Sequence, residues 1–251
     1  MKNSFEAISV QPIGVIESCY PDKFGTPRQP GLVSEARGRI RFRADVQPEQ
    51  ALEGLDRYSH VWVLFYFHLN TNQRYHAKVH PPRLGGETMG VFATRSPHRP
   101  NPIGLSLIEI EKIEGEFLYL KGLDLVDGTP VLDIKPYLPQ VEALASAQAG
   151  WTHDVPEKSI SVRWTLAAEA DFLDWTQTST NEWMQRQQAQ AVRSLIESTL
   201  KLDPRPVVYR GYENQESPYR NEHAVRIYDG DVHFHFTSAN EIEVLKILFK
   251  T

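Results

Sequence analysis

Along residues 8–140, hydrophobic and polar side chains alternate with the two-residue period of a strand that buries one face. These stretches are rich in β-branched and aromatic residues, and Pro, Gly and Asp separate them. We predict strands over residues 8–18, 38–43, 60–68, 90–94, 105–113 and 117–125, and a further strand after Thr129. Only residues 48–55 are helix-like. Such short strands without long helices between them favour a closed or partly closed β-barrel over a doubly wound sheet.

The second part of the chain mixes the two periods. We predict a linker over residues 143–150, a strand over residues 160–166, and helices over residues 167–177 and 180–200. A hairpin around Asp229-Gly230 is predicted over residues 223–237, and a final strand or short helix over residues 241–249. Asp203-Pro204 ends the second helix. The pattern therefore predicts a mainly β, non-Rossmann barrel domain over residues 5–145, followed by a small α+β domain over residues 150–251.

Composition narrows the class of protein. The 251 residues are 41% hydrophobic and 24% charged, as in ordinary globular proteins. The longest apolar stretch, Val61 to Phe67, is far shorter than the roughly 20 residues of a membrane-spanning helix. Cys19 is the single cysteine, which excludes an intramolecular disulfide and a cysteine zinc site. No signal peptide is evident, so we expect a cytoplasmic protein without membrane or metal partners.

The net charge of −5 argues against a positive field over the whole surface, which nucleic acid would favour. Four arginines nevertheless alternate along one predicted strand, namely Arg37, Arg39, Arg41 and Arg43. Alternation on a strand places all four on one face. We call this face the arginine stripe. It is either a local phosphate-binding surface or an ordinary solvated strand face, and the sequence leaves both open.

The central loop, Gly90 to Gly104, has the clearest functional signal. Its sequence is GVFATRSPHRPNPIG, with three prolines in six positions that restrict the backbone. A stiff loop that carries Arg95, Arg99 and Asn101 suits a pre-organised polar site. The alternative is a rigid loop that closes the barrel and pairs its arginines with carboxylates.

Two further clusters of polar residues lie near predicted strand ends. The first, KFGTPRQPG over Lys23 to Gly31, is a second stiff loop with an arginine. The other, DLVDGTPVLDIKPY over Asp124 to Tyr137, contains three aspartates beside a lysine and a tyrosine, which are candidate proton acceptors. His68 ends the buried strand that precedes the central loop. Two stiff loops of this kind are able to line one pocket.

Several other signals are weak. The glycines before the central loop do not match the spacing of a Rossmann phosphate loop, and no helix pattern follows them. His233 and His235 share a strand face, but no carboxylate or cysteine stands at ligand spacing. Cys19 has no activating base in the sequence around it.

Together these motifs resemble the TsaA-like (TrmO) tRNA methyltransferases. The resemblance spans residues 5–142, and the segment DPRPVVY from Asp203 to Tyr209 is a shorter match to the C-terminal domain of that family. It implies a homodimeric β-barrel enzyme that uses S-adenosylmethionine. It also implies methylation of N6 in threonylcarbamoyladenosine at position 37 of tRNA, in the anticodon loop.

The resemblance also implies which residues hold the cofactor. They come from the second loop, the end of the buried strand, the central loop and the DGTP turn, and they are Pro27, Arg28, Gln29, His68, Leu69, Arg95, Leu105, Asp127, Gly128, Thr129 and Pro130. Leu69 is expected to contribute through its backbone.

The chemistry leaves some roles open. The attacking nitrogen must lose a proton, and Asp124, Asp127 or Tyr137 is able to accept it, although positioning alone also suffices. Arg28, Arg95 and Arg99 suit carboxylates, and Tyr137 or Phe92 suits base stacking, with core packing the favoured role of Phe92. A non-catalytic cofactor sensor, an RNA-binding module without cofactor and, more distantly, a metal-dependent hydrolase are the alternatives.

Overall fold

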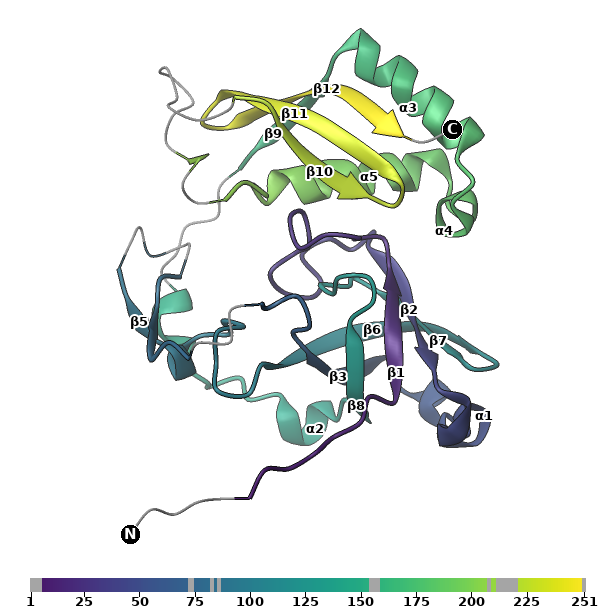
Figure 1. Ribbon diagram of the computed structural model, residues 1–251, viewed down its shortest axis with the longest axis vertical. Helices are drawn as coiled ribbons and strands as arrows, with labels where there is room; N and C mark the ends of the chain where they lie inside the picture. The colour runs from purple at the N-terminus through teal and green to yellow at the C-terminus, as the bar shows by residue number, and fades with distance from the viewer. Residues whose placement is uncertain are drawn as a thin grey trace.

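The computed structural model describes residues 6–71, 75–81, 84, 87–153, 159–206, 209–210 and 221–249. Its first part is a closed barrel of six antiparallel strands in the order β1-β2-β7-β6-β3-β8 (Figure 1). In chain order the barrel strands are β1 (Gly14–Ser18), β2 (Arg37–Phe42), β3 (His60–Tyr66), β6 (Ile103–Glu114), β7 (Phe117–Lys121) and β8 (Pro130–Pro136). The predicted barrel is therefore confirmed, and it is fully closed.

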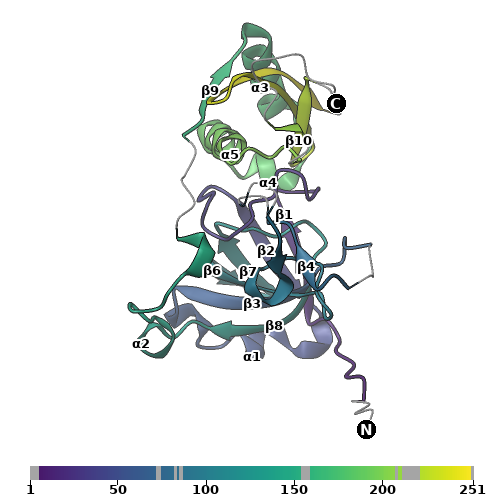
Figure 2. The same cartoon turned by 90° about the vertical axis from the view of Figure 1, so that its left-hand side faces the viewer.

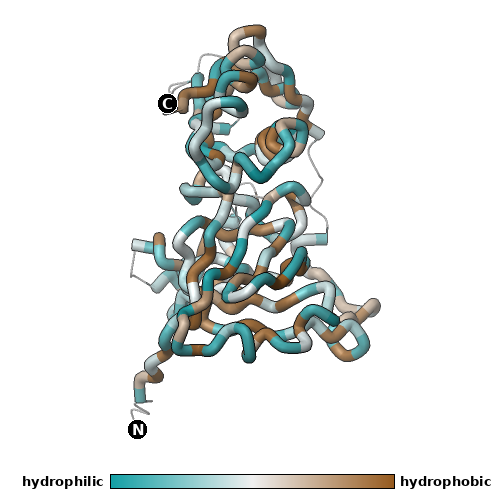
Figure 3. Tube along the Cα trace, turned by 90° about the vertical axis from the view of Figure 1, so that its right-hand side faces the viewer, coloured by the Kyte–Doolittle hydropathy of each residue, from teal (hydrophilic) through white to brown (hydrophobic). Residues whose placement is uncertain are grey.

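The two-residue alternation sets the inner and outer faces of the barrel, as the alternating colours along its strands show (Figure 3). In β3, Val61, Val63 and Phe65 are buried and the residues between them are more exposed. In β6, Gly104 and Ser106 face inward. A side chain at Gly104 would overlap the ring of Phe65, because an ideal Cβ there lies 2.1 Å from its Cζ.

The strand register brings three connections between strands to one end of the barrel. The end of β3 pairs with the start of β6, with Tyr66 opposite Ile103. The start of β8 pairs with β1, with Pro130 opposite Val15, and Asp127 just before β8 bonds Ser18 at the end of β1. We call this the loop end. Residues 19–36, 67–102 and 122–129 all connect strands there.

The smaller elements of the N-terminal part lie around the barrel. The structure has short helices α1 (Pro48–Ala51) and α2 (Pro139–Glu142), a two-stranded sheet of β4 (Lys78–Val79) and β5 (Met89–Gly90), and 3-10 turns over Ala44–Val46, Leu55–Arg57, Val91–Ala93 and Gly150–Thr152.

The second part is an α+β unit, as predicted. Its four-stranded sheet has the order β10-β11-β12-β9, in which β12 and β9 are parallel. The elements are β9 (Ser161–Trp164), α3 (Leu166–Thr178), α4 (Glu182–Gln185), α5 (Ala189–Lys201), β10 (His223–Ile227), β11 (Gly230–Ser238) and β12 (Glu241–Phe249). This unit lies over the loop end of the barrel (Figures 1 and 2). No helix in the described ranges has the length and apolarity to cross a membrane.

The structure corrects the start of the central loop. The predicted strand over residues 90–94 ends at Gly90, and a 3-10 turn over Val91–Ala93 follows it. The turn closes when the Thr94 amide donates to the carbonyl of Val91. Phe92 consequently points outward and is 74% exposed, so the expected core packing of Phe92 is wrong.

Two predictions for the C-terminal part also change. The single helix over residues 180–200 is two helices, because the Asn181 side chain accepts the Trp183 and Met184 amides and starts α4, after which the chain turns again before α5. The hairpin turn is Tyr228-Asp229, since Ile227 pairs with Gly230. Gly230 begins β11, where Trp175 leaves no room for a Cβ.

Candidate functional site

The central loop is held rigid by its own hydrogen bonds. Val91 is buried and its amide donates to Ala77. The Thr94 hydroxyl donates to the Val91 carbonyl at 2.8 Å and accepts from the Ser96 amide at 3.3 Å. Arg99 reaches back to the Thr94 carbonyl at 3.4 Å. Arg99 therefore shapes the loop from within.

Arg95 joins the central loop to the second loop. Its Nη1 donates to Oε1 of Gln29. Arg95 is exposed, Gln29 is half-buried and Pro27 beside it is buried. The two stiff loops that the sequence singled out therefore meet at the loop end.

The DGTP turn lies against His68. Gly128 has a φ of +74°, a conformation that favours glycine, and an ideal Cβ there lies 3.9 Å from Nε2 of His68. The Ser18 amide donates to Oδ1 of Asp127 at 2.9 Å, which fixes the turn to the end of β1. Burial lowers the pKa of His68 from its ordinary value, and the nearby Asp127 charge opposes this effect in part. His68 is therefore a neutral imidazole at pH 7.

A short turn after β3 connects His68 to the central loop. The Phe67 amide donates to the carbonyl of Pro102, and Nδ2 of Asn70 donates to the carbonyl of Pro97 at 3.0 Å. Leu69 lies between them and is 44% exposed. The prolines of the central loop thus supply fixed acceptors that hold the His68 turn in place.

Asp124 lies beneath this group of loops. Ser106, on the inner face of β6, donates to Oδ2 of Asp124 at 2.9 Å. The other carboxyl oxygen, Oδ1, is fully enclosed and has no hydrogen-bond partner among the residues that the structure describes. Burial raises the pKa of Asp124 from 3.8 to about 6, although the Ser106 hydrogen bond and the Arg95 charge lower it. A carboxyl with this pKa exchanges its proton close to neutral pH.

The comparisons with known proteins agree with this geometry. Residues 15–143 match the model of the tRNA-methyltransferase O N-terminal domain, and residues 157–250 match that of the TrmO C-terminal domain. The chain belongs to the TrmO family. It is 41% identical over 232 residues to the tRNA (adenine(37)-N6)-methyltransferase of Escherichia coli, covering 90% of this chain and 92% of that protein.

Two relatives from Pseudomonas aeruginosa extend the comparison. One carries the name of an S-adenosylmethionine-dependent methyltransferase, and it is 45% identical over 240 residues, covering 95% of this chain and 97% of that protein. The other is a solved crystal structure of TrmO, with a TM-score of 0.75 and 38% identity over 97% of this chain and 99% of that chain. Both parts of the present chain therefore have TrmO counterparts.

Within this TrmO fold, Tyr137 lies apart from the loop end, and Leu105 lies near it with its side chain turned outward. Tyr137 follows β8, and its amide donates to His60 at the opposite end of β3. The seven-residue strand β8 separates it from the DGTP turn by roughly 20 Å. Leu105 is on β6 next to inward-facing Ser106, but its own side chain faces outward and is 49% exposed.

The arginine stripe lies on one face, as predicted, but carboxylates already pair with it. Arg39 and Arg41 share Glu17 at 2.6 and 2.7 Å, and Arg37 pairs with Glu111 at 3.0 Å. The guanidinium of Arg39 also stacks 3.8 Å from the ring centre of Phe117. This pairing supports the interpretation of the arginine stripe as a strand face with its own counter-charges rather than as a phosphate-binding surface.

Sequence reasoning missed Ser106. The available signal was the alternation in β6, where a glycine and a serine occupy consecutive inward positions of a strand that is otherwise apolar inside. A small polar residue facing a barrel interior needs a buried partner. That partner, Asp124, lies 18 residues further on, and only the closed barrel brings the two together.

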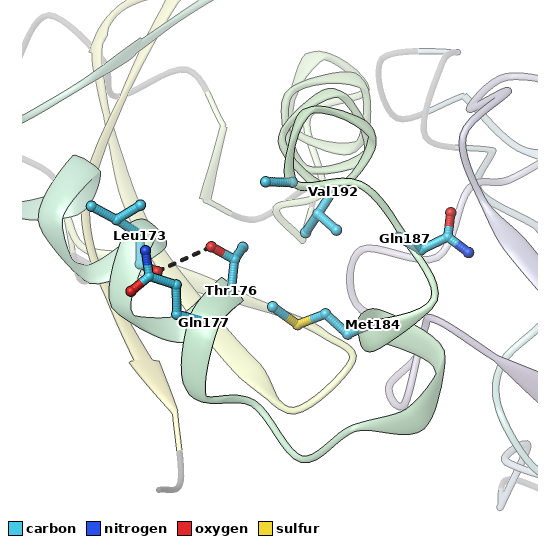
Figure 4. Close-up of a pocket in the computed structure, with 7 residues that line it drawn as sticks. Leu173, Thr176, Gln177, Met184, Gln187 and Val192 are labelled. Atoms are coloured by element: carbon cyan, nitrogen blue, oxygen red, sulfur yellow. Dashed lines mark hydrogen bonds between the residues drawn. The ribbon is translucent and has the colours of Figure 1, made fainter.

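The C-terminal unit of the present chain has a cavity of about 220 Å³ between α3, α4 and α5. Figure 4 shows Leu173, Thr176, Met184 and Val192 around it. None of the predicted site residues lines it. Within the described ranges no group of three metal-ligating side chains occurs, and His233 and His235 pair with Glu222 and Glu243 instead.

Proposed function

We propose that the protein transfers a methyl group from S-adenosylmethionine to N6 of threonylcarbamoyladenosine at position 37 of tRNA. The observation that supports this proposal most strongly is that the central loop and the second loop meet at one end of the barrel, where Arg95 donates a hydrogen bond to Gln29. His68 and the DGTP turn lie at the same end. The Escherichia coli relative has the name of a tRNA (adenine(37)-N6)-methyltransferase.

The groups at the loop end suit the chemistry of this cofactor. S-adenosylmethionine supplies a methyl group that its sulfonium already activates. The Arg95 guanidinium matches a carboxylate, and the Oδ2 atom of Asp127 is an acceptor for ribose hydroxyls. Together with Pro27 to Gln29, neutral His68, Leu69, Leu105 and the turn over residues 127–130, these groups are our proposed cofactor-binding set.

Asp124 is the proposed proton acceptor of the three candidates. The attacking nitrogen is conjugated to a carbonyl and must release its proton as the new N–C bond forms. Each aspartate has one hydrogen-bonded carboxyl oxygen, Oδ2 of Asp124 to Ser106 and Oδ1 of Asp127 to Ser18. Asp127 is exposed, whereas Oδ1 of Asp124 is enclosed and has no partner among the described residues. Tyr137 lies at the opposite end of the barrel. A pKa of about 6 leaves the Asp124 carboxyl ionised at pH 7.5 and able to accept a proton.

Phe92 is the proposed stacking platform for a base of the anticodon loop. Its ring is exposed, while buried Val91 and a hydrogen bond from Trp151 to the Ala93 carbonyl at 2.9 Å hold the turn beneath it. Proteins read RNA loops by stacking unpaired bases on such rings. The arginine stripe is not part of this proposal, because its guanidinium groups are paired.

We also propose a cytoplasmic homodimer. Tyr66, Ile103 and Leu105 are each more than 40% exposed on the outer face of the adjoining strands β3 and β6. Exposed apolar side chains that gather on one face are typical of a protein interface. Light scattering of the purified chain measures the oligomeric state, and an Ile103→Glu variant is expected to shift a dimer to monomer.

The proposed activity is tested by incubating the protein with S-adenosylmethionine and two tRNA substrates, one threonylcarbamoylated at adenosine 37 and one with unmodified adenosine. Mass spectrometry of the digested nucleosides is expected to show one added methyl on the threonylcarbamoylated nucleoside. Methylation of the unmodified adenosine alone would overturn the proposed substrate. Absence of any methylated nucleoside, with cofactor binding intact, would favour a cofactor sensor.

Arg95→Ala tests the cofactor site. A lost charge-assisted hydrogen bond is worth about 1.5–3 kcal/mol, so the Kd for S-adenosylmethionine in calorimetry is expected to rise about tenfold or more. Arg43→Ala is the matched control, because Arg43 pairs with Asp45 after the far end of β2. Equal Kd values for the two variants would remove Arg95 from the site.

A further inference from the structure

The second loop belongs to a longer connection between β1 and β2 that the C-terminal unit contacts directly. This connection, Cys19 to Ala36, leaves the loop end of the barrel and carries Pro27, Arg28 and Gln29 (Figure 1). Its first seven residues, Cys19 to Gly25, lie between the barrel and the C-terminal unit. We call these residues the seat segment.

Two buried hydrogen bonds join the seat segment to the C-terminal unit. The hydroxyl of Tyr20 and Oγ1 of Thr199, at the end of α5, are 3.2 Å apart, and both residues are fully buried. The amide of Tyr228, in the β10–β11 turn, donates to the carbonyl of Cys19 at 2.8 Å. A buried hydroxyl that loses its partner is costly, so this contact fixes the position of the segment.

The C-terminal unit also contacts the seat segment close to the second loop. An ideal Cβ on Gly25 would lie 3.3 Å from Cβ of Val225, and Gly25 has a φ of +100°. Asp22 pairs with Arg226 at 3.5 Å. Gly25 is only two residues before Pro27, so β10 of the C-terminal unit packs against the base of the loop that carries Gln29.

On the barrel side, two hydrogen bonds between described residues hold the second loop. The Gly31 amide donates to Gly122 at 2.9 Å, and Oε1 of Gln29 accepts from Arg95. Among the described residues, the other main-chain hydrogen bonds of this connection involve Cys19, Tyr20, Val33 and Ala36. The C-terminal unit therefore holds the residues that precede Pro27 to Gln29, and the barrel part holds Gln29 and Gly31.

We propose that the C-terminal unit positions the cofactor loop: Thr199, Val225 and Tyr228 hold the seat segment so that Gln29 meets Arg95. This rests on the proposed function, in which Pro27 to Gln29 bind S-adenosylmethionine. Thr199 is a positioning residue that acts through Tyr20 and does not touch the cofactor. Linkage then requires that cofactor binding strengthens docking of the C-terminal unit by the same factor.

Thr199→Val tests the proposal, because valine keeps the volume of threonine and removes its hydroxyl. Thr176→Val is the matched control, since Thr176 bonds only backbone carbonyls of its own helix α3, on the cavity of Figure 4. Calorimetry at a temperature well below unfolding is expected to show about a fivefold rise in the Kd for S-adenosylmethionine in Thr199→Val and no change in Thr176→Val. Thr199→Ser restores the hydroxyl and is expected to restore the affinity.

Kinetics separate positioning from loss of folded protein. In Thr199→Val the KM for S-adenosylmethionine is expected to rise while kcat at saturation stays near that of the wild type. A fall in kcat with an unchanged KM and Kd would overturn the proposal. Tyr20→Phe removes the same hydrogen bond from the other side, so it provides a second variant if Thr199→Val does not fold.

The combined variant gives a further criterion. If Tyr20 and Thr199 act through one contact, the double variant is expected to have the same Kd as either single variant, within about twofold. Fully multiplicative effects would overturn the proposal. Failure of the wild-type chain to bind S-adenosylmethionine would refute the proposed function itself, whereas normal wild-type binding with an unaffected Thr199→Val variant would refute only the positioning role.

Discussion

Asp124 shows how position changes the chemistry of one residue. Its carboxyl lies beneath the loops, where burial raises the pKa to about 6, and Ser106 donates a hydrogen bond to its Oδ2 atom. The sequence offered Asp124, Asp127 and Tyr137 as equal candidates for a proton acceptor. The strand register separates Tyr137 from the others, and burial distinguishes the two aspartates, because Asp127 is exposed and the carboxyl of Asp124 is largely enclosed.

The raised pKa of Asp124 has a consequence for stability. Between pH 3.8 and about 6 the folded chain binds one more proton at this site than the unfolded chain, so stability falls as the pH rises through this window. The cost at neutral pH is up to about 3 kcal/mol. Asp124→Asn is therefore expected to keep or raise the free energy of unfolding at pH 8, measured by urea denaturation, and to flatten its dependence on pH between 4 and 7.

The same variant tests the catalytic role. Methyl transfer by the wild type is expected to rise with pH through about 6, as Asp124 ionises, and Asp124→Asn to lower the rate about 100-fold and abolish this rise. Asp133→Asn, on an exposed pair with Lys135, is the control. A wild-type rate in folded Asp124→Asn would show that another group accepts the proton.

Phe92 supplies a second prediction for a single residue. Because its ring is 74% exposed, Phe92→Ala is expected to leave the unfolding free energy and the Kd for S-adenosylmethionine nearly unchanged. Stacking on one base is worth about 1–3 kcal/mol, so kcat/KM for tRNA is expected to fall between about fivefold and 100-fold. Phe92→Tyr keeps a ring and is expected to retain activity. An unchanged kcat/KM in Phe92→Ala would exclude stacking.

At the scale of elements, the start of β6 depends on Gly104. A Cβ there would lie 2.1 Å from Cζ of buried Phe65 on the neighbouring strand β3. Gly104→Ala is expected to lower the free energy of unfolding by about 1–3 kcal/mol through overpacking, as urea denaturation measures. Gly90→Ala is the control, since a Cβ there meets nothing within 4 Å. Equal stability of the two variants would show that Phe65 moves aside at no cost.

The elements that sequence patterns predicted best are those with a sustained period. The alternation in β3 and β6 is long, so both strands were predicted to within two residues at each end. The start of the central loop was wrong because Val91 and Phe92 continue the alternation while the backbone turns over Val91–Ala93. Likewise, α4 and α5 share one helical period, and only the Asn181 cap and the turn between them show that they are separate.

At the scale of the whole molecule, one cluster of buried residues extends from the barrel into the C-terminal unit. Tyr20 and Thr199 belong to the contact between them. Calorimetric unfolding is therefore expected to give a single transition for both parts, shifted upward as a unit when S-adenosylmethionine binds. Two separate transitions, of which the cofactor shifts only the first, would contradict this shared stability.

The sequence by itself determined the fold class, the family and the identity of the loops at the site. The alternation of hydrophobic and polar residues is a local pattern that indicates a strand with one buried face. The prolines of the central loop restrict its backbone whatever its surroundings in the fold. The domain bounds at residues 145 and 150 and the cofactor-binding residues remain predictions from these patterns.

Only the tertiary structure decided what the charged and polar residues do. Arg39 and Arg41 are paired with Glu17, and half-buried Asp124 is bonded to Ser106, because closing the barrel brings distant strands together. The pKa of a carboxyl and the availability of a guanidinium depend on neighbours and on burial, which no local pattern encodes. The contact of Tyr20 with Thr199, 179 residues apart, is of the same kind, since only the docking of two folded units creates it.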